Sequence, residues 1–238
     1  YMFKNLSDLI EVDLSKFDTS IITDMEGMFY GCGNLSLINF TNIITSKVEN
    51  MSYLFYNCFK LSSLDLSEFD TSSVVSMNYM FNNCTKLEIL DISNFNTSKV
   101  DDMSFMFYEC YSLISINLSY FDTSSVIKMN YMFYYCNKLT FINISNFDTS
   151  KVNNMESMFY YCNSLSSLDI SKFDSSSITS MYRMFYYCTK LETLNILNFD
   201  TSKVNKMDYM FYYCNSLSSL DLSNFNTSSV TTMYGMFY

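Results

Sequence analysis

Hydrophobic and polar positions recur every 26 residues along the whole chain. The cysteines occupy a single column, at positions 32, 58, 84, 110, 136, 162, 188 and 214. A methionine column runs from Met25 to Met233 and a phenylalanine column from Phe3 to Phe237, with no insertion that breaks the register. A fixed period of this length is typical of a solenoid, in which each unit buries its apolar side against its neighbours. We therefore expect residues 1–238 to form a single solenoid of nine 26-residue repeats.

The unit at 61–86 shows what each turn should contain. Its first part alternates apolar and polar residues, which predicts a short strand with Leu64 and Leu66 pointing inward. Parallel strands of successive turns are expected to pair about 4.8 Å apart in one continuous sheet. Val74, Met77, Met80, Phe81 and Cys84 follow at spacings of 3, 3, 1 and 3, which is one face of a short helix. The core should hold Leu64, Leu66, Phe69, Val74, Met77, Phe81 and Cys84, and their equivalents in every turn.

The amino-acid composition agrees with one short pattern copied many times. The chain has no proline, only 4 glycines and 18 methionines. Asn and Asp tolerate the left-handed backbone conformation, so we expect them to form the corners in place of glycine. Methionine is flexible enough to fill irregular space between turns of slightly different shape.

The repeated unit resembles that of a known family. The sequence LSSLDLSNFNTSSVTTMYGMF at 217–237, with its repeated D/N-T-S-x-V-x-x-M-x-x-M-F motif, is similar to the BspA-like leucine-rich repeat surface proteins. The similarity covers the whole chain. It implies an α/β repeat solenoid of the leucine-rich-repeat type, with a short parallel strand plus a short helix per turn. It also implies a cell-surface or secreted protein that attaches to a partner.

Both ends of the chain fall at the same point of the unit. It opens with Tyr1-Met2-Phe3 and closes with Met236-Phe237-Tyr238. Solenoids usually carry polar caps on their terminal repeats, and neither end shows one. We therefore expect this chain to be a segment of a longer protein whose signal and anchor lie outside it.

The net negative charge of the chain disfavours two classes of partner. The net charge is −10, from 24 acidic and 14 basic residues, and no basic stripe is visible. Nucleic acid and anionic membrane surfaces are therefore disfavoured as partners. No apolar run approaches the ~20 residues of a membrane span, so we expect no direct membrane insertion by this segment.

The cysteine column has three interpretations. Stacked cysteines would have Cα atoms at disulfide distance, but their Cβ atoms would point in parallel, which disfavours a bond. Without histidine or a CxxC motif, a zinc site has nothing to build on. Free buried thiols are favoured over disulfides, and both over metal binding.

Two other columns, one of aspartates and one of paired tyrosines, each have two interpretations. Asp122, Asp148, Asp174 and Asp200 fall on four consecutive turns, where helix capping is favoured over a ladder of calcium sites. The paired tyrosines at 134–135, 160–161, 186–187 and 212–213 favour ring stacking between turns, with an exposed binding surface as the alternative.

Catalysis is disfavoured. The chain has no histidine, and a regular repeat supplies many copies of each residue where an active site needs a unique constellation. We expect no enzyme and no cofactor. The threonine column (Thr71, Thr97, Thr123, Thr149) could suggest ice binding, but it lies at the capping corner.

The candidate binding surface is the outward face of the strand, formed by the columns of positions 63, 65 and 67. Most turns read Ser-Asp/Asn-Ser there, and large residues stand out against that background. Apolar anchors ringed by polar residues are typical of contact hot spots. The candidate binding residues are Leu37, Asp65, Ile89, Asp91, Phe141, Asn143, Asp169 and Leu197, with Phe141 the first of them. The acidic ones favour a partner with basic or hydroxyl-rich groups.

Three functions follow from this surface. The first is an adhesion module that recognises a host or matrix protein or a glycan. The second is a structural spacer that presents another domain, with the apolar exceptions as drift in a tolerant repeat. The third, intracellular scaffolding, is disfavoured by the family resemblance.

Overall fold

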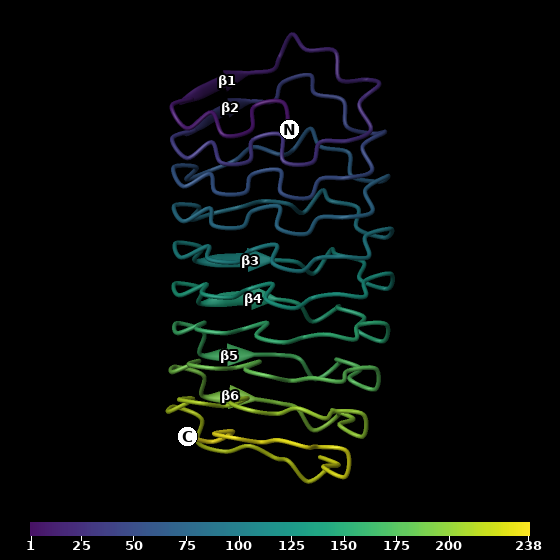
Figure 1. Ribbon diagram of the computed structural model, residues 1–238, viewed down its shortest axis with the longest axis vertical. Helices are drawn as coiled ribbons and strands as arrows, with labels where there is room; N and C mark the ends of the chain where they lie inside the picture. The colour runs from purple at the N-terminus through teal and green to yellow at the C-terminus, as the bar shows by residue number, and fades with distance from the viewer.

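The computed structural model describes residues 1–238 as turns of chain stacked along one long axis (Figure 1). Its regular elements are six short strands on the same side of the stack. They are β1 (Glu11–Asp13), β2 (Leu37–Asn39), β3 (Ser115–Asn117), β4 (Phe141–Asn143), β5 (Ser167–Leu168) and β6 (Thr193–Leu194). The predicted solenoid of 26-residue turns is therefore confirmed.

The strands pair in parallel, with each residue opposite its equivalent in the next turn. Val12 lies opposite Ile38, and Ile116 lies opposite Ile142. The expected continuous sheet is wrong, because the strands form three separate two-stranded sheets, β1–β2, β3–β4 and β5–β6. Single backbone bonds join turns between the sheets, as where Ile114 N–H donates to Glu88 O at 3.2 Å. Because each strand has only two or three residues, the loss of one bond between turns is enough to end a strand.

The short helix expected in each turn is also wrong. Residues 77–84 form consecutive β-turns, in which Met80 N–H donates to Met77 O (3.2 Å) and Cys84 N–H donates to Phe81 O (3.1 Å). Such bonds span three residues, so a series of turns brings apolar side chains inward at nearly the spacing of a helix. No element of the chain is a helix long and apolar enough to cross a membrane.

The other N–H groups of this segment bind the next turn of the solenoid. Phe81 N–H donates to Met106 O (3.0 Å), and Phe107 N–H donates to Met132 O (2.9 Å). A helix would keep these bonds within itself. Here they form a ladder parallel to the axis, which begins at parallel bridges such as Asp102 to Lys128. This ladder, rather than the strands, is the more continuous link between turns.

The β-turns require left-handed backbone at two positions in most turns. Tyr79 has φ 57° and Asn83 has φ 58°, and the same columns hold Gly27 and Gly31 in the first turn. Asparagine fills some of these positions as expected, but tyrosine fills more of them. A tyrosine in this region costs about 1 kcal/mol or more of strain. Its N–H bond to the next turn, 3.0 Å from Tyr79 N to Ser104 O, offsets that cost.

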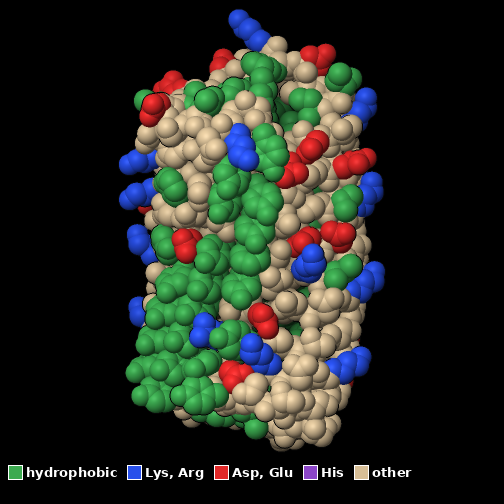
Figure 2. All heavy atoms as spheres, in the orientation of Figure 1, with side chains coloured by type: hydrophobic (Ala, Val, Ile, Leu, Met, Phe, Trp, Pro, Cys, Tyr) green, Lys and Arg blue, Asp and Glu red, His purple; other side chains and the backbone are tan.

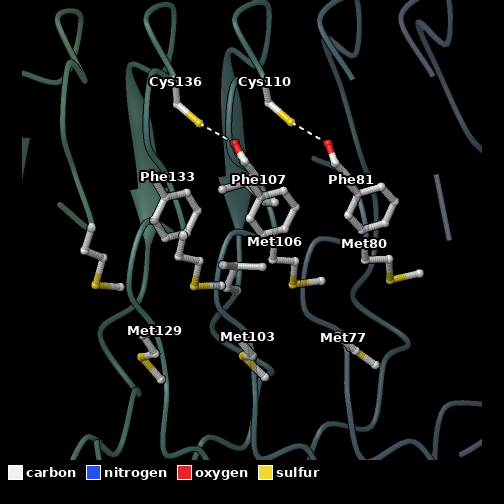
Figure 3. Packing of buried hydrophobic residues seen from close by; sticks show 14 of the residues in the cluster. Met77, Met80, Phe81, Met103, Met106, Phe107, Cys110, Met129, Phe133 and Cys136 are labelled. Atoms are coloured by element: carbon white, nitrogen blue, oxygen red, sulfur yellow. Dashed lines mark hydrogen bonds between the residues drawn. The ribbon is translucent and has the colours of Figure 1, made fainter. Parts of the chain in front are cut away.

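One hydrophobic core runs the length of the stack. Leu66, Phe69, Val74, Met77, Phe81 and Cys84 are buried as predicted, while Leu64 is half-buried and packs against this core. Figure 3 shows the methionine and phenylalanine columns of successive turns in register. Phe133 is fully buried, with its ring centroid 5.4 Å from that of Phe107 and 5.7 Å from that of Phe159.

The cysteine column is part of this core. Seven thiols are buried and Cys214 is half-buried, and all eight are free. Each thiol donates to a phenylalanine carbonyl of the preceding turn, as from Cys136 Sγ to Phe107 O at 3.2 Å (Figure 3). Because burial disfavours the thiolate, the pKa of the Cys110 thiol is raised to about 12. The column therefore contributes a polar contact between turns that an alanine or valine could not make.

Tyrosine rings stack between turns on the outside of the core, as the sequence favoured. Tyr134 and Tyr160 have centroids 4.4 Å apart, and Tyr161 and Tyr187 have the same separation. Two such columns run side by side in the C-terminal half. Figure 2 shows a band of hydrophobic side chains on one broad face that widens toward the C-terminal turns.

We expect the phenylalanine column to dominate stability. Phe133→Ala should lower the free energy of unfolding by about 3–5 kcal/mol, because it leaves a cavity between two stacked rings. Phe59→Ala, at an exposed phenylalanine, should change it by about 0.5 kcal/mol or less. Denaturant unfolding followed by circular dichroism measures both. Equal effects of the two variants would contradict this core.

The buried thiols should resist alkylation. In the folded protein seven cysteines should stay unlabelled by iodoacetamide, whereas Cys214 should react slowly because it is half-buried. All eight should react after denaturation. Mass spectrometry of protein labelled before and after unfolding gives the counts, and rapid labelling of Cys110 in the folded state would count against this packing.

The stacked tyrosines should make stability fall in alkali. Burial, together with neighbouring tyrosines, raises the pKa of Tyr79 and of Tyr161 from 10.0 to about 12. The folded state therefore favours the neutral ring, and this contribution is complete below pH 10 and lost as the pH rises through 12. Absorbance at 295 nm should show these rings titrating later in folded protein than in protein unfolded by urea. Coincident titration curves would show that the stacked rings are as hydrated as free tyrosine.

Candidate functional site

The strand face carries the exposed apolar side chains that the sequence singled out. Leu37 is 57% exposed, Ile89 69% and Phe141 55%. All three occupy one column on alternate turns, with Ser63 and Ser115 between them. Leu197 is 40% exposed but lies in the column of Ser67, so it does not extend this row. The side chains of Leu37, Ile89 and Phe141 are therefore available to a partner.

A shallow hollow lies between Ile89 and Phe141, over the small side chain of Ser115. Its lining residues are Ile89, Leu90, Asp91, Ser93, Ser115, Ile116, Asn117, Tyr120 and Phe141. The hollow exists because a serine separates two large residues in the same column. The structure thus brings together three of the predicted residues, Ile89 and Asp91 from one turn and Phe141 from two turns further along.

Sequence reasoning missed Tyr120, which is 66% exposed and lines the same hollow. Its column otherwise holds only polar residues, among them Asn94 and Asn146. In those turns the amide donates to a carbonyl of the preceding turn, as from Asn146 Nδ2 to Ser119 O at 3.1 Å. A large aromatic residue in a column of asparagine, lysine and glutamate is the signal that identifies Tyr120 in the sequence.

The predicted aspartates each use one carboxylate oxygen within their own turn. Asp91 Oδ1 accepts the backbone N–H of Ser93 at 3.0 Å, and Asp65 and Asp169 bind their own serines in the same way. These hydrogen bonds lower the pKa of all three carboxyl groups, so they are ionised at neutral pH. The second oxygen of each carboxylate has no partner within the chain and remains available.

The remaining predicted residues do not join this hollow. Asn143 is half-buried, and its side-chain oxygen accepts from the Ser145 hydroxyl at 2.9 Å. Asp169 lines a second hollow, whose walls in the same column are Ser167, Thr193 and Ser219. That hollow therefore has the carboxylate of the first one without large apolar walls.

The strand segments carry acidic residues in six of the nine turns. In each of the nine turns we define a strand segment of six residues, which are 61–66 and the equivalent positions from 9–14 to 217–222. Together these segments contain eight acidic residues and no lysine or arginine. The eight are Glu11, Asp13, Asp65, Glu88, Asp91, Asp169, Glu192 and Asp221. The ion pair of the chain, Lys128 to Asp102 at 3.1 Å, lies outside these segments. Lysines next to the segments offset part of this charge: besides hydrogen bonds from Ser15 and Ser171, Lys16 and Lys172 lower the pKa of Asp13 and Asp169, whereas no lysine acts on Asp91 in this way.

The acidic column at the corner performs a local structural task. Asp122 Oδ1 accepts the backbone N–H of Ser124 at 3.0 Å. Asp148 and Asp200 likewise each accept the backbone N–H of the serine two residues later in the chain. The turns have no helix to cap, so these aspartates fix a turn instead. No group of three or more acidic or thiol side chains is placed to hold a metal ion.

Comparison with solved structures gives leucine-rich repeat proteins. The leucine-rich repeat protein of Treponema pallidum is 20% identical, with 68% of each chain covered and a TM-score of 0.47. A leucine-rich cell surface protein of Faecalibacterium prausnitzii is 18% identical over 89% of this chain and 47% of its own, with a TM-score of 0.46. A leucine-rich repeat protein of Leptospira interrogans is 14% identical over 96% and 61%, with a TM-score of 0.37. This chain thus spans about half the length of the Faecalibacterium protein.

Comparison with curated proteins gives no match. A family model does match, at residues 1–90, 33–142, 79–189 and 164–238. These overlapping stretches cover the whole sequence, as expected for a model several repeats long placed on a tandem array. The solenoid seen here and the tandem matches agree with the leucine-rich repeat resemblance found in the sequence. The chain belongs to the family described as Mycoplasma protein of unknown function, DUF285.

Proposed function

We propose that this chain is a non-enzymatic binding module of a cell-surface or secreted protein, which recognises a protein or glycan through its strand face. In this proposal residues 1–238 are one solenoid of nine repeats within a longer protein. The observation that carries it is the pair of exposed side chains, Ile89 and Phe141, around a hollow on an otherwise polar face. Exposed apolar groups ringed by polar residues favour a contact surface.

The regularity of the chain supports binding over catalysis. The chain has no histidine, and seven of its eight thiols are buried. Hydrogen bonds from Ser93 and Ser124 lower the pKa of Asp91 and Asp122, which makes these two carboxyl groups poor proton donors at neutral pH. The cell-surface location rests on the resemblance to the BspA-like proteins.

The proposal is tested by restoring the repeat consensus at the hollow. The double variant Ile89→Ser, Phe141→Ser should lose binding of the chain to host cells or extracellular matrix, because both apolar walls are removed. Serine occupies this column in four other turns, so folding should be preserved. Binding is measured with fluorescently labelled protein, and circular dichroism checks the fold.

A matched control is Ile127→Thr, which replaces another exposed aliphatic residue by the threonine found in its column at positions 23, 179 and 231. It lies outside the strand face and should leave binding unchanged. If the double variant bound as well as the unaltered chain, the strand face would not be the contact surface and the spacer function would be favoured.

A further inference from the structure

The hollow over Ser115 has the features of a site for one kind of side chain. We propose that it receives a lysine or arginine side chain of a partner polypeptide, with the aliphatic stem between Ile89 and Phe141 and the cationic head at Asp91. This inference rests on the proposed function, since it requires that the strand face bind a partner. It goes further by naming the chemistry of that partner.

The walls of the hollow fit an aliphatic stem. Ile89 and Phe141 occupy the same column two turns apart, which is about 10 Å at the spacing of parallel strands. The small side chain of Ser115 leaves the space between them open. Lysine and arginine bury their methylene groups along apolar surfaces while the charged end stays near water or a carboxylate. An open hollow with apolar sides and a charged rim suits that division.

The charge of the hollow selects a cation. Asp91 is ionised and keeps one oxygen free, and Glu88 is exposed in the same turn. Asp65 in the preceding turn adds a further carboxylate beside these two. A cationic partner would meet attraction at these carboxylates, and a hydrogen bond between ionised groups is about twice as strong as a neutral one.

Tyr120 adds a second contact for the cationic head. A cation over a tyrosine ring gains about 0.5–1 kcal/mol at an exposed site. The protein already uses this interaction elsewhere, where the Arg183 guanidinium lies 4.7 Å from the Tyr182 ring centroid and Lys206 Nζ lies 3.8 Å from it. Tyr120 lines the hollow beside Asp91 without a hydrogen-bond partner of its own within the chain.

The second hollow of the strand face serves as an internal comparison. Asp169 accepts the backbone N–H of its own serine as Asp91 does and also keeps one oxygen free, but its neighbours in the wall column are serine and threonine, and Lys172 lies near its charge. If a carboxylate alone sufficed, the two hollows would bind equally. If the walls matter as proposed, only the hollow at Asp91 holds a basic side chain.

The test uses the chain of residues 1–238 and a labelled twelve-residue peptide of four Gly-Arg-Ser units. A copy with citrulline in place of arginine is the neutral probe of similar shape. Fluorescence anisotropy at low salt should show the arginine peptide binding about tenfold more tightly than the citrulline peptide, equivalent to about 1.4 kcal/mol. Asp91→Asn should weaken arginine binding about three- to tenfold. Asparagine occupies this column in other turns, so the fold should persist.

Asp169→Asn is the matched control, because it removes the same charge from the same column. It should change the affinity by less than about twofold, since its hollow lacks apolar walls. Ile89→Ser should weaken binding of the arginine peptide with every carboxylate retained.

Equal affinities for the two peptides, or equal effects of Asp91→Asn and Asp169→Asn, would overturn the inference. These results are separable from those for the proposed function. If the double variant lost binding to cells while the peptides failed to discriminate, the strand face would remain the contact surface and only the basic partner would be rejected. If the peptides discriminated and cell binding was unaffected by the double variant, the hollow would bind basic side chains but would not mediate attachment.

Discussion

The backbone hydrogen bonds that join alternate residues of one turn to the next turn set the register on which the rest of the structure depends. Phe81 N–H to Met106 O and Phe107 N–H to Met132 O advance the chain by 25 residues each, so the same residue types stack at every level. The phenylalanine rings, the thiol-to-carbonyl bonds and the tyrosine columns all follow from that register. Each adds contacts between neighbouring turns, and none joins distant ones, as expected of a solenoid.

The sequence predicts the period, the core and the burial of the cysteines, because these depend on which side chains recur. It does not separate a helix from a series of β-turns, since both bring Val74, Met77 and Phe81 inward at nearly the same spacing. The difference lies in where the backbone N–H groups bond, which side-chain pattern does not record. Left-handed tyrosines such as Tyr79 were equally unpredictable, because that residue type ordinarily avoids the conformation and only its stacking and its bond to the next turn make it tolerable.

The side-chain pattern also identifies only part of the candidate site. Ile89 and Phe141 are departures from the repeat, and an exposed column was correctly assigned to them. Asn143 uses its side-chain oxygen within its own turn, and Leu197 lies in a different column from that of Phe141, so neither lines this hollow. Departures from a repeat thus indicate function only when their column and their neighbours in adjacent turns are considered together.

The hollow over Ser115 is built from three successive turns, whereas each buried layer needs only the common motif. Recombination that deletes, duplicates or reorders whole 26-residue units would therefore preserve the core while changing which side chains become neighbours on the strand face. Moving the turn of Phe141 beside that of Leu37, for example, would abolish this hollow and create a different apolar row. Such an array can generate new recognition surfaces by rearranging existing units, without a single new point mutation and with little loss of foldability.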